Sequence, residues 1–433
     1  MGMKYLVFLI LICMLFFIKN AATSLLIYGF FAADRDGYSF LEFFSTLYPN
    51  FKLYSRSLFL VLFVYSIIYL FLKIRKLTKE EFVKIFLALI ISFLIVFNSL
   101  LKDNDIIWAL SVLVFNGIPV YVIWYIMGLR YNNDYKFLGY ISLKTILATA
   151  VLLIPFLAFL DGSLYKATEG LFVNEVSDVN LSLPTGDSIK GAYSRYSIYH
   201  NPNSLGFHSV IGILIGIYFL VFKKRILKIF GLFLIGCGCI GWLNSLTRGP
   251  MIFLILGFCY IALLNIFYGK RQNFEIKVLL LLSLLGVGLA IFLLSDISKY
   301  LIPDSNDNSV VDRLEGYLYS FDVIKTHFLL GVGKNWDWGQ FYPHFMPLSL
   351  TADHGIIVGV LESISIFMGG IYTIIKASKN YLTISSSREN SLLSIMLVFI
   401  VIGIAVTNNF TAPVIFWIML AQADLLNKRV ING

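Results

Sequence analysis

Long apolar runs separated by short polar segments dominate the chain. About 20 apolar residues are needed to cross the hydrocarbon core of a bilayer as a helix. Twelve segments approach or exceed this length, and each is predicted to be a transmembrane helix. They cover approximately 5–32, 57–73, 84–101, 106–127, 138–160, 206–222, 229–247, 250–268, 278–295, 355–376, 391–408 and 411–427. The pattern therefore predicts an all-α polytopic membrane protein, in which 1–433 forms one integral membrane domain.

Two long polar segments interrupt this pattern, at 161–205 and 296–354. Both are rich in Asp, Asn, Ser, Gly and Tyr, and neither is long enough for an independent domain with a large core. We therefore expect both to fold against the membrane-spanning bundle. In the second segment, apolar residues from Leu314 to Phe328 recur at helical spacing. This spacing predicts an amphipathic helix at the membrane surface, which starts near Arg313 and ends at Gly331-Val332-Gly333.

Basic residues are unevenly divided between the two predicted sides of the membrane. The termini and short connections on one side hold 21 of the 34 Lys and Arg residues and six Asp and Glu residues. The side with the two long segments holds twelve basic and nineteen acidic residues. Because Lys and Arg concentrate on the cytoplasmic side, both termini are predicted to be cytoplasmic and the long segments extracytoplasmic. The net charge of +9 is thus a topology signal, and we predict no nucleic-acid partner.

Composition narrows the class of protein further. Hydrophobic residues make up 58% of the chain and charged residues 14%, and the mean hydropathy is +0.82. Soluble proteins carry about 25% charged residues, so a soluble enzyme, a disordered protein and a secreted disulfide scaffold are excluded. The Cys237 and Cys239 pair lies in an apolar run without a neighbouring His or carboxylate. We therefore predict that these cysteines pack in a membrane helix and bind no metal.

Three arginines on the predicted outer side are candidates for binding an anion. Arg195 precedes one predicted span, Arg248 opens another just before Pro250, and Arg313 starts the amphipathic helix. An arginine at a membrane boundary is costly without a partner, and its guanidinium suits bidentate contact with phosphate. A helix beginning at Pro250 would add free N–H groups and the positive end of its dipole. We predict a lipid-linked phosphate substrate, with headgroup contact, snorkelling or an ordinary surface charge as alternatives.

His354 is the candidate general base, because imidazole titrates near neutral pH. It lies at the mouth of the predicted span 355–376, next to Asp353. Glu362 follows about two helical turns later, and a carboxylate within a span is expensive and often functional. We predict that His354 is catalytic and that Asp353 and Glu362 support it. A structural histidine at the membrane boundary is the alternative.

In order along the chain, these residues resemble motifs of the O-antigen ligase and polymerase superfamily of bacterial membrane glycosyltransferases. Arg195 and Gly206 are separated by ten residues, like an Arg-x10-Gly pattern of the polymerases. The segment 246–249 is similar to a Thr-x-Ser-Arg-Gly element, in which Arg248 takes the arginine position and Thr247 stands where serine is usual. Both elements flank predicted outer ends of spans.

Two further elements of the resemblance lie in the second long segment and after it. Arg313, with the helix that follows and the Gly-x-Gly at 331–333, resembles the second-loop pattern. His354 and Glu362 resemble a His-Asn…Glu…Gly element, although Gly355 replaces the asparagine. Together with the spans and two outer loops, the similarity covers most of the chain as topology.

The resemblance implies a GT-C-like glycosyltransferase that takes a glycan from an undecaprenyl-diphosphate carrier at the outer face of the bacterial inner membrane. It implies that Arg195, Arg248 and Arg313, with Thr247 in support, neutralise the leaving diphosphate without a metal ion or other cofactor. His354 would take the proton from the attacking sugar hydroxyl. The implied partners are the carrier-linked glycan, membrane lipids and a chain-length regulator protein. The three residues Arg248, Arg313 and His354 should then converge on one outward cavity.

We favour a polymerase of O-antigen or another surface polysaccharide, because the chain is rich in Phe, Ile, Tyr and Asn and its His motif departs from the ligase pattern. A ligase that uses lipid A–core as the acceptor is the alternative within the superfamily. The competing class is a transporter or flippase for a lipid-linked glycan. The sparse charged residues in or near predicted spans, Lys19, Glu362 and Asp424, argue against a translocation path.

Overall fold

The computed structural model describes 79–103, 202–245, 249–268, 308–333, 345–384 and 388–407, with short pieces within 138–150 and at 173–175, 195–197, 247, 336–338, 343 and 423. The chain divides into two compact units. Unit 1 comprises Met1–Leu58 and Asn133–Pro250, and unit 2 comprises Phe59–Asn132 and Met251–Gly433. Each unit therefore combines segments that are far apart in the sequence.

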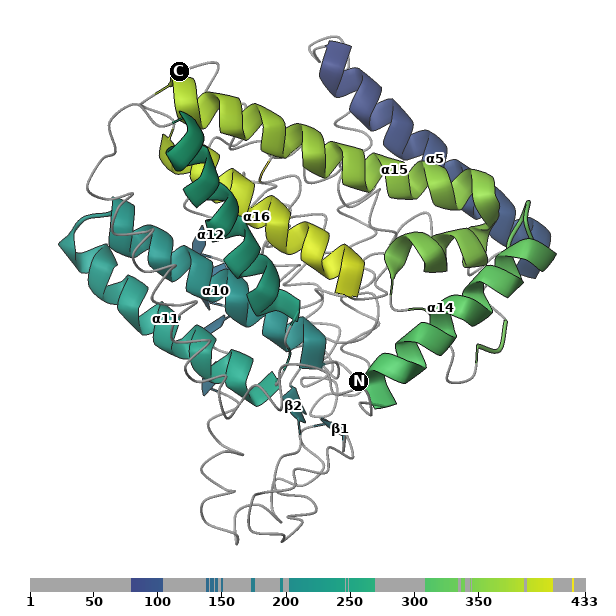
Figure 1. Cartoon of the computed structure of the whole chain (residues 1–433), viewed down its shortest axis with the longest axis horizontal. Helices are drawn as coiled ribbons and strands as arrows, with labels where there is room; N and C mark the ends of the chain where they lie inside the picture. The colour runs from purple at the N-terminus through teal and green to yellow at the C-terminus, as the bar shows by residue number, and fades with distance from the viewer. Residues whose placement is uncertain are drawn as a thin grey trace, which may run out of the picture. The chain divides into compact units, whose positions relative to one another are not determined.

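Helices α10 (Pro202–Phe222) and α11 (Arg225–Ser245) form the centre of unit 1. They are packed against each other as an antiparallel pair, drawn in teal in Figure 1. Only Lys223 and Lys224 separate them, and the Lys223 ammonium lies 4.9 Å from the centre of the Tyr218 ring. Helix α10 begins at Pro202, where a missing N–H group costs no hydrogen bond.

Glycines bring the backbones of α10 and α11 into direct contact. A Cβ added to Gly216 would lie 2.7 Å from the Gly231 carbonyl, and one added to Gly231 would lie 2.7 Å from the Gly216 carbonyl. Further along the pair, a Cβ on Gly238 would lie 2.7 Å from the Ser209 carbonyl. Small residues at helix contacts are typical of membrane proteins, where close packing replaces the hydrophobic driving force.

Threonine hydroxyls add polar contacts to this helix pair. The Thr145 hydroxyl donates to the His208 carbonyl at 3.3 Å, and the Thr149 hydroxyl donates to the Cys237 carbonyl at 2.8 Å. Both threonines are buried. Cys237 is a buried free thiol in α11, and the backbone at this position is part of the packing between helices.

Unit 1 also contains a short antiparallel β-ribbon, which the all-α prediction did not include. Strands β1 (Val173–Glu175) and β2 (Arg195–Ser197) pair with Glu175 opposite Arg195, and β2 contacts α10 and α11. The sequence predicts this part of the chain only as a long outer segment that folds against the bundle. Its pairing with β1, some 20 residues earlier, holds the backbone of Arg195 against the helices.

Unit 2 contains α5 (Lys79–Asp103), α14 (Asn308–Thr326), α15 (Met346–Thr383) and α16 (Arg388–Thr407). It also contains all but the first two residues of α12 (Gly249–Tyr268). Helices α5, α14 and α16 each pack against α15. Helix α15 is therefore the common contact of this unit.

Contacts among α12, α15 and α16 form the interior of unit 2. A Cβ on Gly403 of α16 would lie 2.5 Å from the Phe253 ring of α12. Towards the other end of α12, the Tyr260 hydroxyl lies 3.0 Å from the Ser378 hydroxyl. The Tyr381 hydroxyl donates to the Asn265 amide oxygen at 3.0 Å. The interior thus combines close helix packing with buried hydrogen bonds between helices.

Helix α15 reverses direction at Gly355, which has φ 81° and ψ 171°. In a straight helix, Thr351 and Gly359 would lie about 12 Å apart along the axis. A Cβ on Gly359 would instead meet the backbone of Leu350 and Thr351. Residues 346–354 therefore form a short helix that folds back on 356–383, as the bend near α14 in Figure 1 also shows.

The described helices agree with the predicted spans and with a polytopic membrane protein. Four of them are long and apolar enough to cross a membrane within the described part of the chain. They are Leu205–Phe222, Arg225–Leu243, Met346–Thr383 and Arg388–Val406. Shorter apolar helices at Leu89–Lys102 and Gly249–Asn265 match two more predicted spans. The predicted spans 5–32, 57–73, 106–127, 278–295 and 411–427, and most of 138–160, lie outside the described residues.

Outward-facing apolar side chains on α11 are also typical of a helix in contact with lipid. Ile226 is 82% exposed and Ile229 is 64% exposed, and Leu232, Phe233 and Leu243 are exposed as well. A water-soluble protein rarely leaves so large an apolar patch uncovered. The orientation of the helices relative to the cytoplasm remains a prediction.

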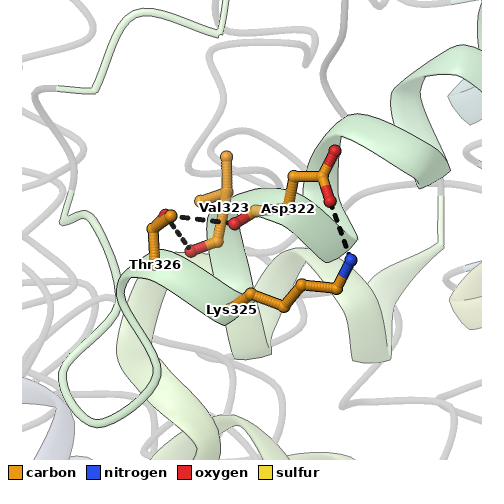
Figure 2. A network of polar contacts seen from close by, with 4 residues as sticks. All are labelled: Asp322, Val323, Lys325 and Thr326. Carbon is orange, nitrogen blue, oxygen red and sulfur yellow. Dashed lines mark hydrogen bonds and ion pairs between the residues drawn. The ribbon is translucent and has the colours of Figure 1, made fainter.

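Helix α14 lies where an amphipathic helix was predicted, but with different ends. It begins at Asn308, so Arg313 stands in its second turn and away from its amino end, where the helix dipole is already weak. It ends at Thr326, before the glycines that were expected to end it. Figure 2 shows this end, where the Thr326 hydroxyl donates to the carbonyls of Asp322 and Val323, both at 3.0 Å. These bonds add to the backbone hydrogen bonds of the last helical turn.

Candidate functional site

In unit 1, the junction between α11 and α12 brings together Gly206 and Thr247, residues of two separate sequence motifs. A Cβ on Gly206 would collide with the Thr247 hydroxyl, so the glycine is required for this contact. Thr247 is buried, and its hydroxyl lies 2.9 Å from the Ser245 hydroxyl. Its carbonyl accepts a hydrogen bond of 2.6 Å from the Trp242 indole. The backbone that leads into Arg248 is therefore held on its amino side by three buried or half-buried partners.

The helix after Arg248 begins at Gly249, with Pro250 in its first turn, as predicted. Arg248 itself lies outside the described residues. The residues on either side of it are described: Thr247 is fixed against α10, and Gly249 starts α12. Free N–H groups are expected at such a helix start. An anion-binding role for Arg248 stays a prediction.

In unit 2, the segment after α14 docks against the reversal of α15. Val332 donates its N–H to the Ala352 carbonyl at 2.9 Å, and Gly333 donates to the Asp353 carbonyl at 3.0 Å. On the other side of the reversal, Ile356 donates to the Phe328 carbonyl at 2.9 Å. The last carbonyls of a helix and the first N–H groups of the next have no partner within those helices. The segment 328–333 supplies partners to both ends.

Three glycines make this docking feasible. Gly331, Gly333 and Gly355 have φ of 67°, 76° and 81°, a region that L side chains rarely adopt. A Cβ on Gly331 would lie 2.5 Å from the carbonyl oxygens of Ala352 and Asp353, and one on Gly355 would collide with the Leu329 carbonyl. The backbone of the segment 328–333 therefore lies directly against the backbone of the reversal in α15. The glycine after His354, which departs from the usual asparagine, is therefore explained by the turn that it forms.

His354 occupies the last position before the reversal and is half-buried. Its carbonyl accepts a hydrogen bond of 2.9 Å from the Asn98 amide on α5. The same amide donates to the Leu330 carbonyl at 3.0 Å. Three elements thus fix the backbone of His354: the short helix that it ends, the docked segment after α14, and α5.

Glu362 lies seven residues beyond Gly355, about 10 Å along the helix that follows the reversal. It is completely buried, and neither carboxylate oxygen has a hydrogen-bond partner among the described residues. A buried carboxyl group without a partner is costly, so its presence needs a reason. Asp353, by contrast, is half-buried and its backbone carbonyl is part of the docked turn. Supporting roles for both acidic residues stay predictions.

The predicted arginines are divided between the two units. Arg195 and Arg248 belong to unit 1, and Arg313, His354 and Glu362 belong to unit 2. The side chains of all three arginines lie outside the described residues. Arg313 lies about 20 Å along α14 from Thr326. The segment 328–333, which docks beside His354, begins only after Thr326. The predicted convergence of the arginines on His354 therefore remains untested.

Other histidines have local roles where the structure describes them. The His327 ring packs edge-on against Trp336 with 5.3 Å between the ring centres. His208 is buried in α10, and its carbonyl accepts the bond from Thr145. His200 and His344 lie outside the described residues. His354 thus stands out through its place at the reversal.

A family model described as O-antigen ligase matches residues 230–361. The match starts in α11 and ends in α15, and it includes Thr247, Arg248, Arg313 and His354. The match covers less than a third of the chain, and it supports the resemblance to the O-antigen ligase and polymerase superfamily. The similarity is consistent with a ligase or polymerase type of glycosyl transfer, a lipid-linked glycan as the substrate class, and a location in a membrane. A search of curated proteins found no match.

Sequence reasoning missed Asn98, whose side chain contacts the backbone of the candidate residue His354. Asn98 stands near the end of the predicted span 84–101, where a lone amide in an apolar run was the available sequence signal. The structure shows that this amide is buried. Its two partners lie 232 and 256 positions further along the chain. No local pattern could have identified those partners.

Proposed function

We propose that the protein is a polymerase of O-antigen or another surface polysaccharide, which joins undecaprenyl-diphosphate-linked repeat units at the outer face of the bacterial inner membrane. The observation that carries this proposal is the position of His354 at a glycine reversal that the segment 328–333 holds on both sides. This reversal lies within the part of the chain that matches the O-antigen ligase family. Such a rigid backbone is what a positioned general base requires.

In the proposed reaction, a hydroxyl of the acceptor sugar attacks the anomeric carbon of the donor glycan. The bond from that carbon to the carrier phosphate breaks, and a new glycosidic bond forms. The proton of the hydroxyl passes to His354, and the electron pair of the broken bond stays on the leaving undecaprenyl diphosphate. Arg195, Arg248 and Arg313 neutralise the charge that develops on this diphosphate, with Thr247 fixing the approach to Arg248. Asp353 and Glu362 support the base.

The deciding assay uses purified protein and lipid-linked repeat units and follows the length of the glycan. We expect chain growth by the wild type and a loss of at least about 100-fold in rate for His354→Ala, the usual contribution of a general base. His327→Phe is the matched control, because it removes an imidazole of the same unit but keeps an aromatic ring against Trp336. Chain growth by His354→Ala at the wild-type rate would refute the assignment of the base.

Ligase activity is the second candidate, because the matching family model is described as O-antigen ligase. Adding lipid A–core to the same assay separates the two reactions. Transfer of the glycan to lipid A–core without polymer growth would identify a ligase. Movement of the lipid-linked unit across sealed vesicles, without any new glycosidic bond, would refute both enzymatic functions and identify a transporter.

A further inference from the structure

Asn98 is a buried amide side chain in the mostly apolar carboxyl half of α5, and it is 3% exposed. Its Nδ2 atom donates to two backbone carbonyls, that of Leu330 at 3.0 Å and that of His354 at 2.9 Å. Both partners are pure acceptors, so the nitrogen of the amide must face them and its two hydrogens are both used. The side chain therefore ties α5 both to the segment 328–333 and to the end of the short helix 346–354.

The carbonyl of His354 needs this partner from outside its own helix. In a regular helix it would accept a bond from the N–H four residues later, but the backbone of Gly355 is not helical. The two preceding carbonyls, of Ala352 and Asp353, are bound by the N–H groups of Val332 and Gly333. Asn98 thus completes a set of three capped carbonyls at the end of the short helix 346–354.

We propose that Asn98 is a positioning residue, which holds the His354 imidazole in its reactive orientation by fixing the carbonyl of His354 against the Leu330 carbonyl. The inference rests on the proposed function of His354 as the general base. The glycine at 355 removes the steric limits that would otherwise restrict rotation next to His354. The two bonds from α5 replace those limits, and a displacement of about 1 Å in a reacting group can lower a rate about 100-fold.

The amide oxygen of Asn98 is buried and has no hydrogen-bond partner among the described residues. Retaining an asparagine here therefore carries the cost of an unpaired acceptor. A leucine of similar size would avoid that cost in an apolar helix, but it would leave the carbonyls of Leu330 and His354 without their donor. The two donated bonds are the benefit that the asparagine provides.

The test compares Asn98→Leu and Asn98→Ser with the matched control Asn265→Leu. Asn265 is also a buried amide in unit 2, on α12, and its bonds go to the Ile261 carbonyl at 2.8 Å and the Tyr381 hydroxyl at 3.0 Å. Its replacement therefore removes an equivalent pair of buried hydrogen bonds without touching the His354 carbonyl. Chain growth on lipid-linked repeat units gives kcat and KM for each variant, and thermal unfolding gives their stability.

We expect Asn98→Leu to lower kcat by about 10- to 100-fold with little change in KM, because the base and not substrate binding is disturbed. Asn98→Ser keeps one hydrogen-bond donor, so its kcat should lie between those of Asn98→Leu and the wild type. Asn265→Leu should lose thermal stability but keep kcat near the wild-type value. A wild-type kcat in Asn98→Leu, an equal fall of kcat in Asn265→Leu, or a change confined to KM would each overturn the inference.

Hydrogen exchange provides a readout that does not depend on activity. The N–H groups of Val332, Gly333 and Ile356 should exchange faster in both Asn98 variants, whereas Asn265→Leu should leave them protected. If Asn98→Leu does not fold, Asn98→Ser carries both measurements. Full activity of His354→Ala would refute the proposed function itself. Loss of activity in His354→Ala together with a wild-type kcat and unchanged exchange in the Asn98 variants would refute this inference alone.

Discussion

The substitution Gly355→Ala offers the sharpest test of the reversal that carries His354. The glycine has φ 81° and ψ 171°, a combination that costs a residue with a side chain about 1–3 kcal/mol. The added Cβ would also collide with the Leu329 carbonyl. That carbonyl is backbone and cannot rotate away, so the segment after α14 must move.

Movement of this segment breaks further contacts. The bond from the Ile356 N–H to the Phe328 carbonyl and the bond from Asn98 to the His354 carbonyl are the nearest, and each contributes about 1 kcal/mol. We therefore expect Gly355→Ala to destabilise the protein by about 3–5 kcal/mol in all. Because a whole domain is stable by only about 5–15 kcal/mol, a large part of its stability would be lost.

The assay is the midpoint of thermal unfolding in detergent, together with the initial rate of chain growth at a temperature where the variant is still folded. Gly369→Ala is the matched control on the same helix, because a Cβ there meets nothing within 4 Å. Alanine should even stabilise that position by up to about 1 kcal/mol, through its higher helix propensity. If Gly355→Ala unfolds at the same temperature as Gly369→Ala and retains the wild-type rate, the account of the reversal is wrong.

Two further predictions concern the junction in unit 1 and the end of α14. Gly206→Ala should push the Thr247 hydroxyl out of its buried position, at a cost in stability of about 1–3 kcal/mol, and should lower the rate of chain growth. Gly236→Ala is the control and should behave as wild type, because a Cβ there meets nothing within 4 Å. Equal rates in the two variants would contradict the role of this contact. Lys325→Ala removes an exposed ion pair of 2.9 Å with Asp322, seen in Figure 2, and thermal unfolding should detect a change below about 1 kcal/mol. A larger loss would show that this pair stabilises the end of α14 more than solvent screening allows.

The helices of the membrane-spanning part were predictable because length and apolar content decide them. The span predicted at 250–268 differs from α12 by one residue, since Pro250 marks its first turn. Helix α10 begins four residues before the predicted span 206–222, because Pro202 of the Asn-Pro-Asn segment is its first helical residue. Local chemistry can favour a turn or a helix start at such a position, and only the packing of α10 selects between them.

The geometry around His354 was not predictable to the same degree. The sequence identifies His354 and the glycine pair at 331–333 as candidate residues, and the structure brings them into contact through backbone hydrogen bonds. The reversal itself depends on Gly355 facing the Leu329 carbonyl, a contact between segments that a pattern of apolar residues does not encode. The short helix 346–354 was likewise missed, because nine residues are too few to show a clear helical period.

The two bonds of Asn98 have a consequence for the order in which the protein assembles. They close loops of 232 and 256 positions, whereas the contact between α10 and α11 needs only the two-residue connection between them. Contacts between distant segments form late, because the entropy of closing the loop must be overcome first. During synthesis, α10 and α11 can pair as soon as both are in the membrane, but α5 must wait for α15. If His354 is the base, as proposed, it would acquire its final orientation only in a nearly complete chain, so an unfinished protein would hold the parts of the site without its activity.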